Sequence, residues 1–239
     1  MKNKYDLYIM IPSMTTREKK LSILLALIKD EVIKCNAAIV LVLDYTSITD
    51  DIEIPKDIPV LTIHTDQVGY WRCLNLALSH IKEDQPFLYT SDDILPTEGW
   101  LTEAIWQWNE YVPHGVGLAC LHDGYVGDAS CGHGILTKHY LTVLFGRPNF
   151  PEQFNHLYLD TLISDRAKQI GAYVFCEKAE VNHQHHIIGN IERDIVSITT
   201  DGRSTGDKDR KDRMDVFWMK RGRKNALRRK SEILEMLED

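Results

Sequence analysis

The first half of the chain alternates between short apolar runs and longer segments whose apolar residues recur at helical spacing. The apolar runs predict strands at residues 5–13, 37–45, 58–65 and 85–93. The segments between them predict helices at residues 17–35, 69–81 and 98–111. The run AAIVLVLDY has almost no polar position, as expected of a parallel strand that is covered on both faces. Strands and helices that alternate at this length predict a doubly wound, mostly parallel α/β sheet with helices on both faces.

The second half of the chain is less regular. Its pattern predicts a strand at 116–124, a strand that passes into a helix at 132–145, a helix at 160–171 and a strand at 172–186 that is interrupted near Lys178. Gly171 is a plausible C-cap of the third of these elements. From about residue 201 the chain is polar and charged, with an amphipathic helix expected near its end.

Composition and charge narrow the class of protein. The 239 residues are 44% hydrophobic and 26% charged, which is typical of a soluble globular protein. The five cysteines are scattered without a CxxC pair, which favours reduced thiols in the cytoplasm over a disulfide framework or a zinc ribbon. No apolar run near the N-terminus is long enough to span a bilayer, and no signal-peptide pattern surrounds it.

The net charge of −7 hides a basic segment near the C-terminus. Residues 203–230 hold 12 Lys and Arg against four Asp. A solvated terminal helix explains such a segment, and so does a surface that contacts an anionic polymer or a membrane.

Two adjacent carboxylates, Asp92 and Asp93, end the predicted strand at 85–93, and residues 88–101 contain no basic side chain that would neutralise them. Buried carboxylates are costly unless a cation or hydrogen-bond donors meet them. One interpretation is that Asp92 caps the following turn and Asp93 faces solvent. The other is a Mg²⁺ or Mn²⁺ ion held by one or two carboxylates together with substrate phosphates. Ser13 and Asp44 also fall at predicted strand ends, where doubly wound sheets bind their ligands.

Histidines and a third carboxylate add to this picture. On an extended strand His183 and His185 of VNHQHH point to the same face, where imidazole beside carboxylate suits Mn²⁺. A metallohydrolase would also use such a pair, but the sequence has no second HxH. Asp160 opens a predicted helix, where it is either an N-cap or, if it points into the cleft, a general base.

In their order and spacing these segments resemble the nucleotide-sugar-dependent glycosyltransferases of the GT-A fold, most of all the inverting family 2. The matching segments are IPSMTTRE at 11–18, GYWRCLNLAL at 69–78, the stretch from Ser91 to Trp100, and Asp160 followed by Arg166 and Gly171. The chain departs from that family where LDYTSITDD lacks an Asp and a Gly, where Arg72 does not directly precede Asn75, and where Leu159 replaces a Glu.

The resemblance implies a mixed, mostly parallel GT-A sheet in one domain over residues 1–200 and a helical tail at 201–239. Residues 1–100 would bind the nucleotide-sugar and residues 101–200 the acceptor. It implies a divalent cation held by Asp93 with His183 or His185, and Asp160 as the catalytic base, with Asp165 or Asp123 as substitutes. The donor, of the UDP or GDP type, would contact Pro12, Ser13, Arg17, Asp44, Arg72, Asn75, Ser91 and Asp92. The acceptor would contact Trp100 and His133.

The function implied is the metal-dependent transfer of a hexosyl or pentosyl group to an acceptor hydroxyl with inversion. The acceptor is left open among modified DNA, a glycan and a lipid-linked glycan. A nucleotidyltransferase on the same fold is one alternative, with Arg17, Lys19 and Lys20 near the first loop as its basic residues. A nucleic-acid-binding module that acts through the basic tail is another, although no zinc finger, RNP motif or OB pattern supports it.

Overall fold

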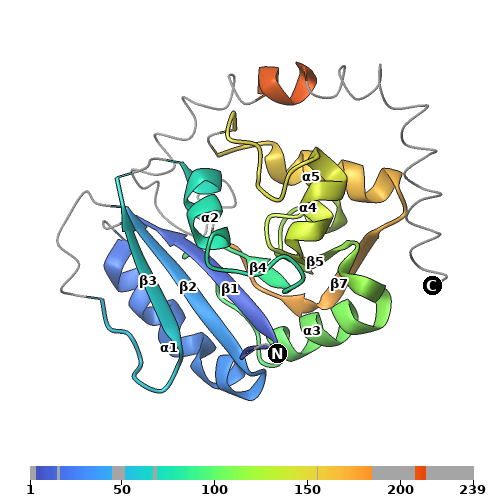
Figure 1. The fold of residues 1–239 in the computed structure, drawn as a ribbon. Helices are drawn as coiled ribbons and strands as arrows, with labels where there is room; N and C mark the ends of the chain where they lie inside the picture. The colour runs from blue at the N-terminus through green and yellow to red at the C-terminus, as the bar shows by residue number, and fades with distance from the viewer. Residues whose placement is uncertain are drawn as a thin grey trace.

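The computed structural model describes residues 4–14, 17–44, 52–66, 69–154, 156–184 and 208–213. Within these residues seven strands form one sheet in the order β3-β2-β1-β4-β6-β5-β7 (Figure 1). The strands are β1 (Leu7–Ser13), β2 (Ala37–Asp44), β3 (Val60–Thr65), β4 (Phe87–Tyr89), β5 (Leu118–His122), β6 (Gly134–Leu136) and β7 (Tyr173–Glu180).

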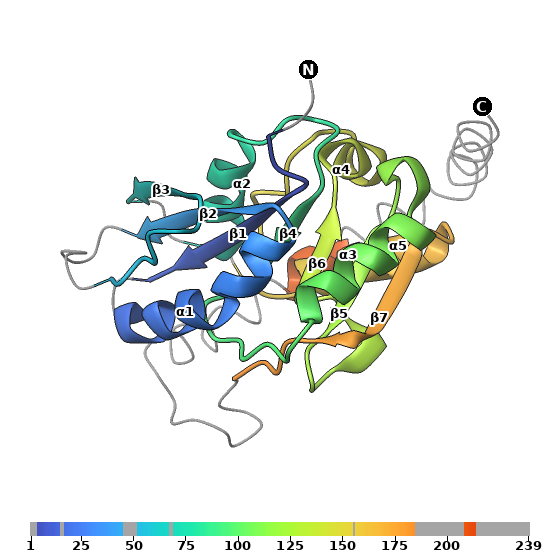
Figure 2. The ribbon, with the colours of Figure 1, turned by 90° about the horizontal axis from the view of Figure 1, so that it is seen from below.

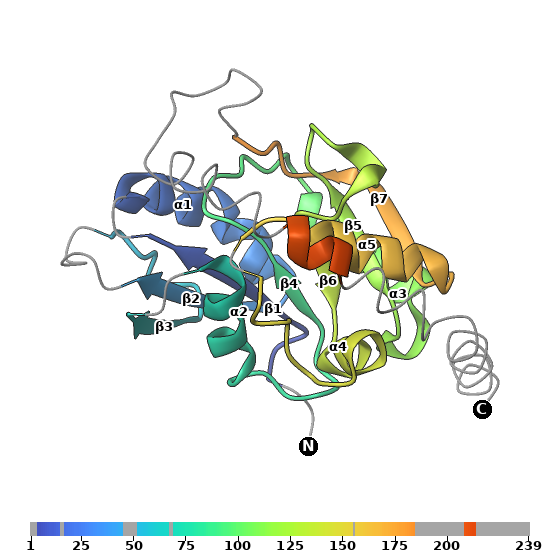
Figure 3. The same cartoon turned by 90° about the horizontal axis from the view of Figure 1, so that it is seen from above.

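In the described part of the chain, five named α-helices cover the two faces of the sheet (Figures 2 and 3). They are α1 (Glu18–Lys34), α2 (Tyr70–Leu78), α3 (Trp100–Tyr111), α4 (Lys138–Phe145) and α5 (Leu159–Gln169). Helices α1 and α3 lie on one face (Figure 2), and α2, α4 and α5 lie on the other (Figure 3). The buried apolar side chains accordingly form two clusters, one on each side of the sheet. No helix in the described part of the chain is long and apolar enough to cross a membrane.

The sheet is mixed and mostly parallel, as predicted. Strand β6 is the exception, because it runs antiparallel to both of its neighbours, β4 and β5. An antiparallel strand begins at the edge where its parallel neighbours end. The residues just before Gly134 therefore lie beside the carboxyl ends of β4 and β5, where the strand register pairs Gly134 with both Tyr89 and Cys120.

Strand β7 is irregular, as predicted from its interruption near Lys178. Its pairing with β5 shifts register between Leu121, which faces Cys176, and His122, which faces Glu180. A bulge of this kind bends a strand and redirects the residues that follow it. After the bulge the chain runs along the segment that follows β4, where Ile94 and His183 form an isolated antiparallel bridge.

Candidate active site

Four side chains from distant parts of the sequence meet at the carboxyl edge of the sheet. Ser13 ends β1, and its hydroxyl donates a hydrogen bond to Oδ2 of Asp92 at 2.6 Å. Arg17 precedes α1, and its Nη1 lies 2.5 Å from Oδ1 of Asp92 and 3.0 Å from Oδ2 of Asp93. The cation that neutralises the two carboxylates therefore comes from a segment 75 residues earlier in the chain.

His183 completes the ring of charges around Asp93. Its Nε2 lies 3.2 Å from Oδ1 of Asp93. Two backbone hydrogen bonds fix this approach: the amide of His183 donates to the carbonyl of Asp123 at 2.8 Å, and the amide of Gln184 donates to the carbonyl of Asp93 at 2.7 Å. The segment after β7 is thus joined to the segment after β4, which explains why residues 90 positions apart share one site.

The two adjacent carboxylates have opposite electrostatic environments. Burial alone would raise the pKa of Asp93, but the hydrogen bond from His183 and the charges of His183 and Arg17 hold it far below its usual range. The pKa of Asp92 is raised, because its burial and the charge of Asp93 outweigh Arg17 and the Ser13 hydroxyl. Asp93 in turn raises the pKa of His183 against the effect of burial. Asp93 is therefore the carboxylate of the pair whose ionised form is favoured more strongly.

His133 lies behind His183. It is 1% exposed, and its Nδ1 lies 3.0 Å from the hydroxyl of Thr90. Its ring meets the ring of His183 edge to face, with centroids 5.1 Å apart, and its Nε2 has no hydrogen-bond partner among the described residues. Burial, followed by the charge of His183, lowers the pKa of His133 to about 3, so this imidazole is neutral. The structure thus places His133 under the site and not on a surface that an acceptor would reach.

Asp160 lies in the first turn of α5. It is not the N-cap, because the helix begins at Leu159 and the capping position is Tyr158, with φ 66°. The hydroxyl of Ser130 donates to Oδ2 of Asp160 at 3.0 Å. Burial raises the pKa of Asp160, opposed by the amide of Thr161, the Ser130 hydroxyl and the charge of Lys211.

Tyr70 is the first residue of α2, and the charges of both the strand-end carboxylates and Asp160 act on its phenol. Its hydroxyl donates to the carbonyl of Thr90 at 3.0 Å. Burial raises the pKa of Tyr70 strongly, and the negative charges of Asp93, Asp160 and Asp92 raise it further. One phenol therefore lies within electrostatic reach of both the strand-end carboxylates and the helix carboxylate. The sequence prediction missed Tyr70 and Ser130, and the only signal for Tyr70 was its place at the start of a helix that follows a strand end.

The two substitute bases are already engaged. Oδ1 of Asp123 accepts hydrogen bonds from the amides of Tyr125, Val126 and Gly127 at 2.8, 2.9 and 3.3 Å, so it stabilises a turn. Oδ2 of Asp165 lies 3.5 Å from Nζ of Lys211. Both contacts are structural, and they favour Asp160 among the three carboxylates.

Lys211 belongs to the predicted basic tail. The described residues 208–213 are largely helical and lie beside α5 (Figures 1 and 3). The contact with Asp165 and the electrostatic effect on Asp160 place this piece of the tail beside the N-terminal part of α5. The rest of the predicted tail, 201–207 and 214–239, lies outside the described residues.

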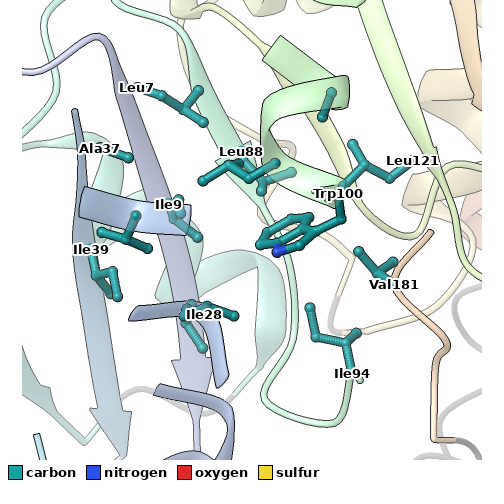
Figure 4. Packing of buried hydrophobic residues seen from close by; sticks show 14 of the residues in the cluster. Leu7, Ile9, Ile28, Ala37, Ile39, Leu88, Ile94, Trp100, Leu121 and Val181 are labelled. Atoms are coloured by element: carbon teal, nitrogen blue, oxygen red, sulfur yellow. The ribbon is translucent and has the colours of Figure 1, made fainter. Parts of the chain in front are cut away.

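Trp100 is part of the core. It is 2% exposed, and its ring packs among apolar side chains that include Leu88, Ile94 and Val181 (Figure 4). This location leaves the ring no free face for stacking on an acceptor. The expectation that Trp100 binds the acceptor is therefore corrected to a role in packing α3 against the sheet.

Most of the other residues that were predicted to bind the donor do not gather around Asp92 and Asp93 as Ser13 and Arg17 do. Asn75 bonds both backbone groups of the fully buried Phe150, at 2.9 and 3.0 Å, and so holds the 146–154 loop against α2. Arg72 is exposed on α2, away from these contacts, Pro12 is buried within β1, and Ser91 is half-buried beside Asp92. Asp44 ends β2, and its side chain lies outside the described residues, as does the whole of His185.

Asp93 and His183 fit a divalent cation. Two adjacent ligands of an octahedral ion, each about 2.1 Å from the metal, lie about 3 Å apart. The 3.2 Å between Nε2 of His183 and Oδ1 of Asp93 matches this spacing. In the described part of the chain no three His, Cys, Asp or Glu side chains group as a metal site, so these residues offer a cation the pair of Asp93 and His183 and no third ligand of these types beside it.

The fold is shared with several solved enzymes. A mannosyltransferase from Pyrobaculum calidifontis, solved with GDP-Man and Mn²⁺, superimposes with a TM-score of 0.59 at 14% identity over 76% of this chain and 57% of that chain. Glucosyl-3-phosphoglycerate synthase from Mycobacterium tuberculosis, solved with Mn²⁺ and UDP, gives a TM-score of 0.53 at 12% identity over 77% and 75% of the two chains. The protein has a GT-A fold.

The same GT-A fold also occurs in a putative glucose-1-phosphate thymidylyltransferase from Bacillus anthracis, with a TM-score of 0.50 at 11% identity over 71% of this chain and 85% of that chain. The chain spans 57% of the length of the mannosyltransferase. The sequence matches no family profile and no curated protein. These likenesses establish the fold, and the function has to be argued from the site.

Proposed function

We propose that this protein is a glycosyltransferase that moves a sugar from a nucleoside-diphosphate sugar to an acceptor hydroxyl with the help of a divalent cation. The observation that carries the proposal is the 3.2 Å pair of Asp93 and His183 at the carboxyl edge of the sheet, near a Tyr70 phenol whose pKa is raised by the charges of both Asp93 and Asp160. Similar structures contain GDP-Man or UDP together with Mn²⁺, which supports a donor of the GDP or UDP type.

The donor side of the site neutralises negative charge. When bound at Asp93 and His183, the cation would offset the charge that develops on the leaving diphosphate. Arg17 adds a permanent positive charge beside the same carboxylates. Asp44, at the end of β2, is proposed to bind the nucleotide base, and residues 1–100 as a whole would form the donor half of the domain.

The acceptor side removes a proton. Asp160 would take the proton of the acceptor hydroxyl while the oxygen attacks the anomeric carbon from the face opposite the diphosphate. The new bond joins that carbon to the acceptor oxygen, and the old bond breaks with its electron pair going to a diphosphate oxygen. Attack from the opposite face inverts the anomeric configuration. Ser130, which donates to Oδ2 of Asp160, orients the carboxylate for this step.

A nucleotidyltransferase on the same fold is the second candidate, because one similar structure is a putative thymidylyltransferase. Such an enzyme holds a triphosphate near its first loop with basic side chains. Here Arg17 is a basic side chain that contacts Asp92 and Asp93, and Lys19 is exposed on α1. The nucleotide that the protein binds and the product that it releases decide between the two activities.

The test is whether the protein binds a nucleotide in a metal-dependent way, measured by the shift of its Tm and by calorimetry. A ligand at 100 times its Kd stabilises the fold by about 2.7 kcal/mol, which corresponds to roughly 5–10 °C for a chain of this size. We expect GDP or UDP with Mn²⁺ to raise the Tm of the parent by this amount and Asp93→Ala to lose the effect. Glu98→Ala, which removes an exposed carboxylate from the same segment, should keep it.

If Asp93→Ala binds the nucleotide and Mn²⁺ as well as the parent does, the metal assignment is wrong. A nucleotidyltransferase would instead be stabilised by nucleoside triphosphates and would release pyrophosphate from them with a sugar 1-phosphate. Release of free sugar or glycoside from a GDP- or UDP-sugar distinguishes the two activities.

A further inference from the structure

Arg17 contacts the carboxylate that is proposed to bind the metal ion, so a metal ion and Arg17 would compete for it. One of its guanidinium nitrogens contacts both Asp92 and Asp93, at 2.5 and 3.0 Å, and its side chain is only 10% exposed. The other oxygen of Asp93 faces His183 at 3.2 Å. Without a ligand, one oxygen of Asp93 thus faces the Arg17 guanidinium and the other faces the His183 imidazole.

This arrangement has an electrostatic consequence. A divalent cation that binds Asp93 meets the guanidinium at the same carboxylate, and like charges a few ångströms apart in a partly buried site repel each other strongly. Arginine keeps its proton at every accessible pH, so loss of a proton does not relieve the repulsion. It is relieved when the guanidinium turns to a new anion, and a diphosphate offers two oxygens in the geometry that arginine binds best.

We propose that Arg17 is an exchangeable counter-ion of the metal site, which holds Asp92 and Asp93 until a diphosphate arrives and then binds the diphosphate. The divalent cation consequently binds weakly alone and tightly with the diphosphate. This inference rests on the proposed function for the statement that the diphosphate is part of the sugar donor. It assigns Arg17 a positioning role that couples the two ligands, and by linkage each ligand strengthens the other by the same factor.

The experiment measures Mn²⁺ binding to the full chain by calorimetry, with and without inorganic pyrophosphate. Arg17→Gln removes the charge, and Lys19→Gln, the matched control, removes an exposed charge from the first turn of α1, which follows Arg17 directly. We expect Arg17→Gln to bind Mn²⁺ alone about tenfold more tightly than the parent, because the competing cation is gone. We also expect the strengthening of Mn²⁺ binding by pyrophosphate to fall about tenfold. Lys19→Gln should match the parent in both measurements.

Arg17→Gln is expected to strengthen the binding of Mn²⁺ alone and to weaken the effect of pyrophosphate, and these opposite changes make the outcome decisive. Arg17→Gln with unchanged or weaker binding of Mn²⁺ alone overturns the inference. If this variant fails to fold, Arg17→Lys decides: it keeps the charge but not the forked geometry, so the strengthening by pyrophosphate should drop severalfold, and a parental value overturns the inference. A parent that responds to Mn²⁺ and pyrophosphate as described but binds neither GDP nor UDP contradicts the proposed function and leaves the role of Arg17 standing.

Discussion

Replacing Asp160 by Asn separates catalysis from stability. The substitution keeps the size of the side chain and an oxygen that accepts the hydrogen bond from Ser130, which lies 3.0 Å away in the parent. It removes the group that would accept the proton. General base catalysis contributes about 10²–10⁴ in rate, or roughly 3–5.5 kcal/mol of barrier. We expect turnover of Asp160→Asn to fall by this factor while its affinity for the donor stays near the parental value.

The stability of the same variant follows from the sign of the pKa shift. Burial raises the pKa of Asp160 above its unfolded value of 3.8. A raised pKa stabilises the fold fully below the unfolded value, and this contribution is lost as the pH rises through the folded value. At neutral pH the ionised carboxylate therefore costs stability, and Asn, which does not titrate, avoids that cost. Asp160→Asn should be as stable as the parent at pH 7 or more stable by less than about 1 kcal/mol.

The assay pairs turnover of a GDP- or UDP-sugar with urea unfolding at several pH values. The parental rate should fall as the pH drops through the raised pKa of Asp160, and the stability of the variant relative to the parent should rise with pH over the same range. A variant with near-parental turnover refutes the reasoning, because Asp160 would then do no more than accept a hydrogen bond from Ser130. A variant that is inactive but unfolded says nothing about the base, which is why unfolding is measured alongside.

Two further predictions concern neighbouring contacts. Lys211→Gln removes a positive charge that lowers the pKa of Asp160, so the acidic limb of the pH–rate profile should move to higher pH. Lys208→Gln, at an exposed position of the same short helix, should leave the profile unchanged, and identical profiles for the two variants would contradict the role of Lys211. Asn75→Ala removes the side chain that bonds the buried backbone amide and carbonyl of Phe150. This loss should lower the free energy of unfolding by about 1–3 kcal/mol and the Tm by several degrees. A parental Tm would show that other contacts hold the 146–154 loop.

The order of strands and helices was predictable because it depends on local periodicity. Apolar runs marked the strands and helical spacing marked the helices, so the alternation that defines the mixed, mostly parallel sheet could be recognised. The limits of elements were less accurate: residues 85–93 were predicted as a strand, and β4 covers only Phe87–Tyr89. A run of apolar residues reports burial, and burial continues beyond the last residue that pairs with a neighbouring strand.

The partners of the site residues were not predictable, because they are set by tertiary packing. The antiparallel β6 brings His133 under the site, and the contact of Arg17 with Asp92 and Asp93 joins segments 75 residues apart. Periodicity identifies a buried face but not the group that lies against it. For the same reason the sequence predicted that Trp100 contacts the acceptor, although its ring is buried in the core.

The different environments of Asp93 and Asp160 support the roles proposed for them without reference to any similar protein. Asp93 is met by Arg17 and His183, which hold its pKa far down, so it remains an anion that can keep a cation at any working pH. Asp160 is met by a hydroxyl and an amide, with Lys211 acting more weakly, so burial raises its pKa and makes it the better proton acceptor of the two. The negative charges of both carboxylates raise the pKa of the Tyr70 phenol. Carboxylates in one cleft whose pKa values are pushed apart in this way divide the work between binding charge and moving a proton. A transfer that needs a neutralised leaving group on one side and a deprotonated nucleophile on the other requires that division.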